Sequence, residues 1–259
     1  MNLETVEGSI YDWPKYYEFV YGSDWQAECD FLQDCFDQFA TGSTHRLFEP
    51  ACGTGRLVYR LGKLGYQVSG LDLNPSAVEF CNQRFAKHDM PTSAWVGDMC
   101  DFEVKQPFDA AFNTINSFRH LVTDQMAKDH LKAMSKAVRK GGIYVLGLHL
   151  TPTEGDADEQ EEWTNRRGHL QINSSMWLLE RNLPQRYENF AIVFDVYTPT
   201  KQFRIKDEFR FRTYTKDQML ELISSAGEFE IAETFDFAYD EPIEIDAETQ
   251  DTVFILKRK

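Results

Sequence analysis

The sequence predicts an α/β protein whose parallel sheet is covered by helices on both faces and which carries an antiparallel β insertion. Between residues 45 and 150, short apolar runs alternate with amphipathic helical patterns, and this βαβαβ alternation is typical of such a sheet. From Thr151 to about residue 213 the helical patterns stop and strand-like runs follow one another. With 259 residues, the chain is long enough for one large domain with an insertion.

The N-terminal segment, residues 1–44, is predicted to be helical. Residues 11–21 are dense in aromatic side chains, and Pro14 is favoured in the first turn of a helix. A second amphipathic segment runs from Trp25 to Phe39 with apolar residues at helical spacing, and Thr41-Gly42-Ser43 ends it.

The central region supplies the strands and helices of the sheet. Asn74 is a good N-cap for one helix, and Gly141-Gly142 is expected to end another. The predicted strands are 47–48, 67–73, 94–96, 108–112 and 143–150, and the predicted helices are 57–64, 75–85 and 124–139.

The insertion is read as antiparallel strands. Phe190, Ile192, Phe194 and Val196 alternate with other residues, and Thr198-Pro199-Thr200 is a plausible hairpin turn. The strands predicted here are 175–180, 187–197 and 201–213. A helix over 216–225 and strands over 229–237 and 252–257 follow.

Composition excludes several classes of function. Lys and Arg number 27 against 42 Asp and Glu, which gives a formal net charge of −15 and disfavours nucleic acid and anionic membranes as partners. No apolar run approaches the roughly 20 residues of a membrane span, and no basic leader precedes an apolar stretch. The five cysteines form no Cys-x-x-Cys pair, so we expect a cytoplasmic protein without a metal site.

A glycine-rich turn follows the first predicted strand, in the segment Glu49-Pro50-Ala51-Cys52-Gly53-Thr54-Gly55-Arg56. Gly53 and Gly55 would let a ligand approach the backbone, although they could also be ordinary turn residues. A dinucleotide-binding loop would have a third glycine where this chain has Val58, which disfavours a pyrophosphate. Glu49, just before the turn, points to a ligand with an ammonium group.

Carboxylates follow the next two strands. Asp72 is placed to accept both hydroxyls of a ribose, or else to cap the next helix. Asp98 could accept a hydrogen bond from an adenine amino group with Met99 against the ring, or be only a loop carboxylate. All these segments fall at carboxyl ends of strands, where open α/β sheets bind ligands.

Together these segments resemble the class I S-adenosylmethionine-dependent methyltransferases, especially small-molecule N- and O-methyltransferases with a β-rich insertion after strand five. The matching motifs are residues 49–55, Asp72, Gly97-Asp98-Met99, residues 108–113 and Lys140-Gly141-Gly142. The resemblance implies a Rossmann-like, mostly parallel seven-stranded sheet whose last strand is antiparallel. It also implies a helical lid over residues 1–44, a cofactor-binding domain over 45–150 and 214–259, and an insertion over 151–213 for substrate or dimer contacts.

The same resemblance implies which residues would hold S-adenosylmethionine. Ala51, Gly53 and Gly55 would contact its methionine part through the backbone, and Asn113 would line the methionyl end. Asp72 and Leu73 would hold the ribose and adenine, and Asp98 and Met99 the adenine. Tyr11, Tyr16, Tyr17 or Tyr21 could close over the cofactor, with Tyr11 and Tyr21 as the candidates retained; an aromatic stripe of this kind could equally belong to the core.

The predicted activity is in-line methyl transfer to an amine or hydroxyl of a small molecule. His120 and His149 are candidate general bases with suitable intrinsic pKa values, although either could be structural. The acidic run 154–162 is a solvated loop, a flap, or an element favouring a cationic amine. The alternatives are a non-catalytic cofactor-binding regulator, an aminopropyl transfer on the same fold, and an NAD-dependent dehydrogenase.

Overall fold

Two sheets organise the protein, and the computed structural model describes residues 3–23, 25–91, 93–154 and 160–259. The larger sheet has seven strands in the order β11-β12-β6-β5-β2-β3-β4. Its strands are β2 Arg46–Pro50, β3 Gln67–Asp72, β4 Ala94–Val96, β5 Phe108–Asn113, β6 Val138–His149, β11 Phe229–Phe235 and β12 Asp251–Arg258. Strand β12 runs antiparallel to both β6 and β11, which confirms the predicted mostly parallel sheet with an antiparallel last strand.

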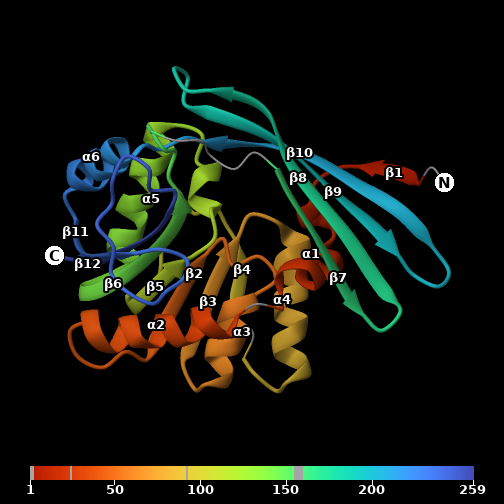
Figure 1. Cartoon of the computed structure of the whole chain (residues 1–259). Coiled ribbons are helices and arrows are strands. Elements are labelled where there is room, and N and C mark those ends of the chain that lie inside the picture. Colours follow the sequence, from red (N-terminus) through yellow and green to blue (C-terminus); the bar gives the residue numbers. More distant parts are fainter. Residues whose placement is uncertain (1–2, 24, 92, 155–159) are drawn as a thin grey trace.

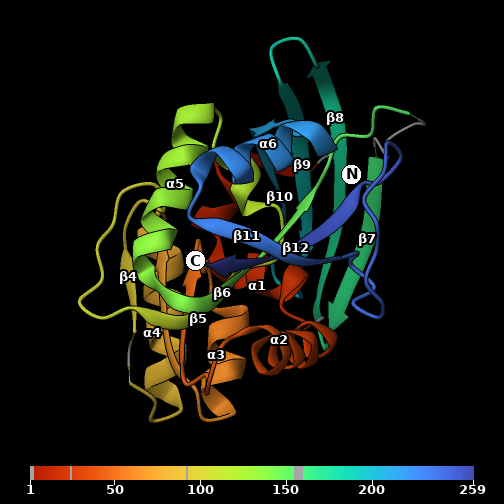
Figure 2. The same ribbon diagram turned by 90° about the vertical axis from the view of Figure 1, so that its left-hand side faces the viewer.

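Helices cover both faces of this sheet because its strands are apolar on both sides. Leu47 and Val145 point into one core cluster, which packs against α2, α3 and α4. Their neighbours Phe48 and Leu146 point into a second cluster with α5 and α6, on the opposite face (Figure 2). Consecutive strand residues point to opposite faces, so both must be apolar when both faces are covered. The helices are α2 Gln26–Phe39, α3 Arg56–Lys63, α4 Pro75–Lys87, α5 Asp124–Ala137 and α6 Lys216–Ala226.

The predicted end of the helix before β6 was wrong. Helix α5 ends at Ala137, and Val138 is already extended with φ −99° and ψ 130°. Gly141 and Gly142 lie inside β6, where the register with β5 shifts. An added Cβ at Gly142 would lie 2.4 Å from the carbonyl oxygen of Asp109, so the glycine allows close strand contact instead of ending a helix.

The insertion forms the second sheet, in the order β1-β10-β9-β8-β7. The strands are β1 Glu4–Glu7, β7 Gln160–Arg167, β8 Leu170–Asn182, β9 Tyr187–Tyr197 and β10 Gln202–Arg212. The hairpin at Thr198 is confirmed, since its backbone N–H donates to the carbonyl of Lys201 at 2.9 Å. Strand β7 was not predicted because it is a mostly exposed, polar edge strand; residues 155–159 of the acidic run lie outside the described residues.

The N-terminal segment contains a strand as well as the predicted helices. Residues 14–21 form α1 (Pro14–Tyr21), after a 3₁₀ turn at Ile10–Asp12. Strand β1 pairs in parallel with β10, which its sequence alone could not indicate because the partner lies about two hundred residues away. Trp13 and Tyr16 then pack on Phe203 of β10, with ring centroids 5.9 and 5.6 Å apart. The 3₁₀ turn and α1 therefore lie between the two sheets (Figure 1).

None of the helices in the described residues combines the length and apolarity needed to cross a lipid bilayer.

The turn between β2 and α3 is packed tightly against α4. Gly53 and Gly55 have φ of +52° and +76°, in the left-handed region that favours glycine. An added Cβ at Gly55 would lie 2.3 Å from Sγ of Cys81 on α4, whereas one at Gly53 would meet only Asp72, at 4.0 Å. The two glycines therefore share a backbone requirement but differ in the space around them.

This difference in space predicts that alanine substitutions at the two glycines lower the free energy of unfolding by different amounts. Gly53→Ala should lower the free energy of unfolding by about 1 kcal/mol, through backbone strain alone. Gly55→Ala should cost about 2 to 4 kcal/mol, because overlap with Cys81 adds to the same strain. Chemical denaturation of both variants measures the difference, and an equal loss in the two would contradict the packing argument.

Candidate functional site

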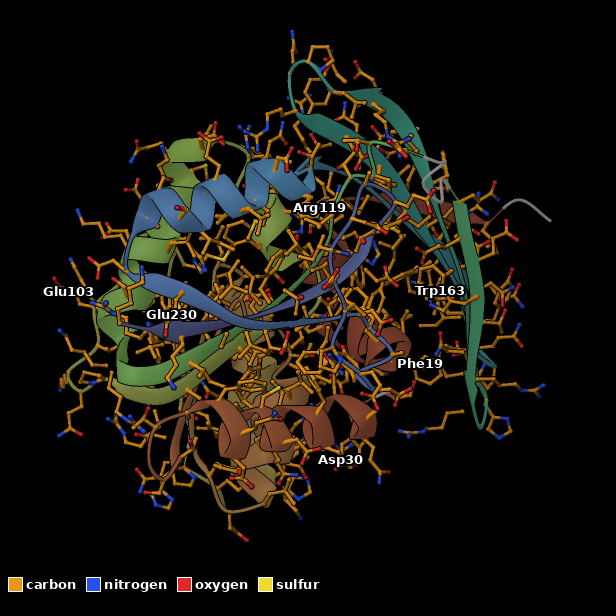
Figure 3. The ribbon with its side chains drawn as sticks, turned by 60° about the vertical axis from the view of Figure 1, so that its left-hand side comes forward. Phe19, Asp30, Glu103, Arg119, Trp163 and Glu230 are labelled. Atoms are coloured by element: carbon orange, nitrogen blue, oxygen red, sulfur yellow. The ribbon has the colours of Figure 1, made fainter. Side chains whose placement is uncertain are left out.

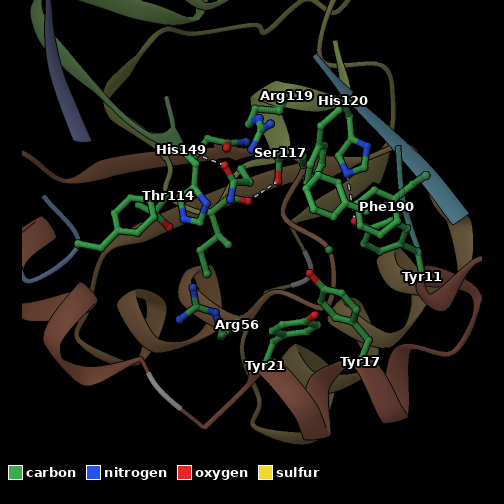
Figure 4. Close-up of a pocket in the computed structure, with 18 of the residues that line it drawn as sticks. Tyr11, Tyr17, Tyr21, Arg56, Thr114, Ser117, Arg119, His120, His149 and Phe190 are labelled. Atoms are coloured by element: carbon green, nitrogen blue, oxygen red, sulfur yellow. Dashed lines mark hydrogen bonds between the residues drawn. The ribbon is translucent and has the colours of Figure 1, made fainter. Parts of the chain in front are cut away.

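A cavity of about 1610 Å³ lies where the carboxyl ends of the parallel strands face the insertion sheet. Its strand-end side comprises the glycine turn and the ends of β3, β4, β5 and β6. Its insertion side comprises one face of β7 to β10 and part of the segment 236–251, and the N-terminal segment lies along it (Figure 4).

All but one of the site residues predicted from the sequence line this cavity. They are Tyr11, Tyr21, Glu49, Ala51, Gly53, Asp72, Leu73, Asp98, Met99, Asn113, His120 and His149. Gly55 does not line it; its conformation instead starts α3 and leaves room for Cys81. Contact between the Gly55 backbone and a ligand stays a prediction.

Asp72 connects the glycine turn to the end of β3. One carboxylate oxygen accepts a hydrogen bond from the Gly53 backbone N–H at 2.7 Å, and the other accepts from that of Asn74 at 2.8 Å. Burial raises the pKa of Asp72, and these two hydrogen bonds oppose the shift. The helix cap is Asn74, whose side chain accepts from Ser76 and Ala77. Each carboxylate oxygen can accept a further hydrogen bond.

Two buried acceptors on the strand-end side have no hydrogen-bond partner. Glu49 is 9% exposed, and its Oε2 is unpartnered. Burial raises its pKa well above the usual range, with nearby Arg56 opposing the shift. The side-chain nitrogen of Asn113 donates to the carbonyl of Pro50 at 2.9 Å, while its Oδ1 is unpartnered. Leaving buried acceptors unpaired is costly, so this corner suits a ligand with N–H donors.

Arg56 is a cavity residue to which the sequence analysis assigned no role. It is the first residue of α3 and forms an ion pair with Glu28 of α2, and it reaches into the cavity (Figure 4). The sequence signal that could have identified Arg56 as a site residue is its position directly after Gly55. The carboxyl groups of Glu28 and Glu49 both lie close to the Arg56 guanidinium.

The N-terminal tyrosines divide between the cavity and the core. Tyr11, Tyr17 and Tyr21 line the cavity, with ring centroids 5.3 Å apart for Tyr11–Tyr17 and 4.8 Å for Tyr17–Tyr21. Tyr16 packs on Phe203 instead. Burial raises the pKa of Tyr17 to about 12, so its hydroxyl is neutral and can donate a hydrogen bond at physiological pH.

The two candidate histidines enter the cavity from different elements (Figure 4). His120 belongs to the 3₁₀ turn η2 (Ser117–His120), and its Nε2 lies 3.1 Å from the Tyr11 hydroxyl. Burial, and then the charge of Arg119, lowers the pKa of His120 to about 4. His149 ends β6, with its Nε2 3.4 Å from a carboxylate oxygen of Asp251 and its ring against Phe237.

The adenine motif predicted from the sequence forms an open rim of the cavity. Asp98 is exposed, and its carboxylate accepts from the backbone N–H of Cys100 at 2.8 Å. Leu73 is 72% exposed at the same rim. The Met99 carbonyl is held by Nδ1 of the buried His130 at 2.9 Å, a contact between residues 31 apart that sequence reasoning missed.

A buried ion-pair network occupies the insertion side. Glu188 of β9 accepts from Arg119 of η2 and, at 2.7 Å, from Arg181 of β8. Arg119 also donates to the carbonyl of Arg212 at 3.1 Å. The sequence alone does not indicate this pairing, because the pairing depends on how the two sheets meet.

The part of the chain around the site matches a known protein family. Residues 48–142 match a family described as a methyltransferase domain. A protein of Geobacillus sp. (strain WCH70), provisionally named a methyltransferase, is 23% identical over 236 residues, or 91% of this chain and 92% of its own.

Solved structures share the whole fold, although their sequences are distant. An S-adenosylmethionine-dependent methyltransferase from Clostridium acetobutylicum ATCC 824 has a TM-score of 0.77 at 15% identity, over 96% of this chain and 99% of its own. The sugar N-methyltransferase KedS8 from Streptoalloteichus sp. ATCC 53650 has 0.76 at 16% identity, over 97% and 94%.

The aminopentose methyltransferase CalS10 from Micromonospora echinaspora, solved with S-adenosylmethionine bound, has a TM-score of 0.75 at 18% identity and covers 100% of both chains. The family match covers the glycine turn and the strands that follow it, so residues 48–142 form a methyltransferase domain, and the chain has the fold of the class I S-adenosylmethionine-dependent methyltransferases.

Proposed function

We propose that this methyltransferase methylates the amino group of a small molecule bound on the insertion side of the cavity. The observation that carries the proposal is the charge of the cavity wall: among the described residues, ten carboxylates and three guanidinium groups line it. Such a wall favours an ammonium substrate over an anionic one. KedS8 is a sugar N-methyltransferase and CalS10 an aminopentose methyltransferase, which agrees with an amine acceptor.

An amine also fits the proton chemistry better than a hydroxyl. A lysine-like ammonium has a pKa of about 10.4, whereas a hydroxyl near the value for water, about 15.7, would need a much stronger base. In the cavity wall, His149, which has Asp251 beside it, is the side chain that would take the proton from an ammonium. None of the described side chains in the wall has the basicity that forming an alkoxide would demand.

The proposed cofactor contacts use the hydrogen-bond acceptors, the backbone and the side chains that line the strand-end side. Asp72 would receive the ribose hydroxyls, and the unpartnered oxygens of Glu49 and Asn113 would receive the ammonium of the methionine part. Ala51 and Gly53 would offer backbone, and Leu73, Asp98 and Met99 would surround the adenine. When bound, the cofactor supplies a methyl group on a cationic sulfonium.

The chain's own residues align the acceptor and exclude water. Tyr11 and Tyr21 would cover the reacting groups, and proximity of this kind can supply several kcal/mol. His120, with its pKa lowered to about 4, is a weak base at neutral pH; we assign it to positioning the Tyr11 hydroxyl. His149, paired with Asp251, is then the better candidate for the proton acceptor.

The proposed domain division gives residues 1–44 the role of a lid, 45–150 and 214–259 that of cofactor binding, and 151–213 that of acceptor binding.

The exposed edge strand β7 supports the further proposal of a homodimer through the insertion, because an unpaired strand edge can pair with a second copy. Light scattering would measure the mass of the particle in solution.

Replacing Asp72 tests the proposed cofactor contacts. Asp72→Asn should weaken binding of S-adenosylhomocysteine by about thirtyfold, or about 2 kcal/mol, because charged acceptors form the stronger hydrogen bonds. Calorimetric titration measures this affinity. Glu79→Gln, on the exposed side of α4, is the control and should bind normally. Unchanged affinity in Asp72→Asn would rule out the ribose contact.

Turnover tests the amine assignment. Incubation with S-adenosylmethionine and paired amine and alcohol acceptors should add one methyl group to amines only, as read by mass spectrometry. With an accepted amine, His149→Gln should lower kcat by about a hundredfold without changing cofactor affinity. Methylation of the alcohols alone would contradict the proposal, and full activity of His149→Gln would remove the proton-acceptor role.

The lowered pKa of His120 predicts a pH dependence of stability. Its pKa is about 4 in the folded protein against a usual 6.5, so the unfolded chain binds more protons between these values. Its contribution to stability is therefore lost as pH falls from about 6.5 to about 4. His120→Gln should show a shallower fall of Tm over this window, by differential scanning fluorimetry, while the exposed control His45→Gln should follow the wild type. Parallel curves for His120→Gln and wild type would refute the prediction.

A further inference from the structure

We infer that the acceptor is an amine on a large apolar body that carries no phosphate; this inference rests on the proposed amine methylation. It comes from three features of the insertion side: its size, its apolar patch and its charges.

The cavity is too large for one ligand of ordinary size. Its volume is about 1610 Å³, whereas pockets for drug-sized ligands measure about 300 to 1,000 Å³. The proposed cofactor contacts all lie on the strand-end side. The insertion side therefore has room for a second molecule of at least comparable size.

An apolar patch faces this room from the insertion sheet; it consists of Trp163, Met176, Phe190, Ile192 and Phe209. Met176 pairs with Ile192 across β8 and β9, and Phe190 pairs with Phe209 across β9 and β10. Cross-strand partners lie side by side on one face of a sheet, so the patch is continuous. Figure 3 shows Trp163 on the side of β7 that faces the rest of the protein.

The patch remains partly open to the cavity. Trp163, Met176 and Phe209 are only half-buried, although they lie on the inner face of the sheet. Covering such surface with an apolar ligand is favourable because it removes apolar area from water. The patch therefore suits a flat aromatic or alicyclic body.

The cations on the insertion side are already engaged by a carboxylate. Arg119 and Arg181 both pair with Glu188, and no lysine of the described residues lines the cavity. Binding a diphosphate takes cations that can turn their N–H groups toward it. With ten carboxylates around the described wall, a nucleoside diphosphate would be repelled.

Aromatic rings and carboxylates would surround the amino end of the acceptor. The ring of Tyr21 lies 6.0 Å from that of Trp163, which joins the apolar patch to the tyrosines facing the proposed methyl site. Aromatic faces stabilise an ammonium group, and Glu161, Glu244 and Asp251 add negative charge at the rim. A cationic amine joined to an apolar body would thus meet both kinds of surface.

Binding of a fluorescent probe to the protein loaded with S-adenosylhomocysteine tests the inference. The probe is dansylcadaverine, a primary amine joined by a pentyl chain to a naphthalene ring, whose fluorescence rises in apolar sites. It should bind, and Met176→Lys should weaken it by about tenfold or more, equivalent to about 1.4 kcal/mol. The matched control is Ser175→Lys, the next residue on β8, which points to the other face and should bind the probe normally. Thymidine diphosphate should not displace the probe.

Absence of probe binding, equal affinity in Met176→Lys and Ser175→Lys, or displacement by thymidine diphosphate would each overturn the inference. S-adenosylhomocysteine affinity verifies that the variants are folded; if Met176→Lys fails this check, Phe209→Ala provides the same comparison. Failure of the proposed function looks different. In that case the probe binds as expected, yet neither it nor any other amine gains a methyl group.

Discussion

The carboxylate of Asp72 is the interaction on which the strand-end side of the site depends. By accepting from the backbone N–H groups of Gly53 and Asn74, it joins the turn after β2 to the turn after β3. The first turn has left-handed backbone at Ala51 as well as at Gly53 and Gly55, and that conformation is costly for alanine without support. One side chain therefore holds the two turns that present Ala51, Gly53 and Leu73 to the cavity.

The insertion side is assembled differently, from segments far apart in the chain. Strand β1 adds to the edge of β10, and aromatic residues at the start of α1 pack on Phe203 of the same strand. The Tyr11–His120 contact then links residues 109 positions apart. Movement of the N-terminal segment would change both the wall of tyrosines and the face of the insertion sheet, so cofactor and acceptor binding are expected to be coupled through it.

Buried charge explains why the two sides differ in chemistry. Glu49 and Asn113 have acceptors without partners on the strand-end side, whereas Glu188 satisfies the two guanidinium groups nearest the apolar patch. An unpaired buried acceptor favours a ligand that donates hydrogen bonds, while a closed ion-pair network leaves little for an anion to bind. The same cavity can thus hold a cationic, hydrogen-bonding cofactor beside an apolar acceptor.

Local patterns in the sequence determined the alternation of parallel strands and helices, the glycine turn and the carboxylates at the strand ends. Apolar periodicity, glycine residues and helix caps act over a few residues, so each segment of the sequence contains the whole signal for its own strand, turn or helix. Only the tertiary structure decided that β1 and β7 are strands, that Gly55 serves packing, that Tyr16 faces away from Tyr17, and that Arg119 and Arg181 share Glu188. Each of these depends on a partner distant in the chain, because an edge strand, a tight contact or a buried ion pair is stabilised by what packs against it.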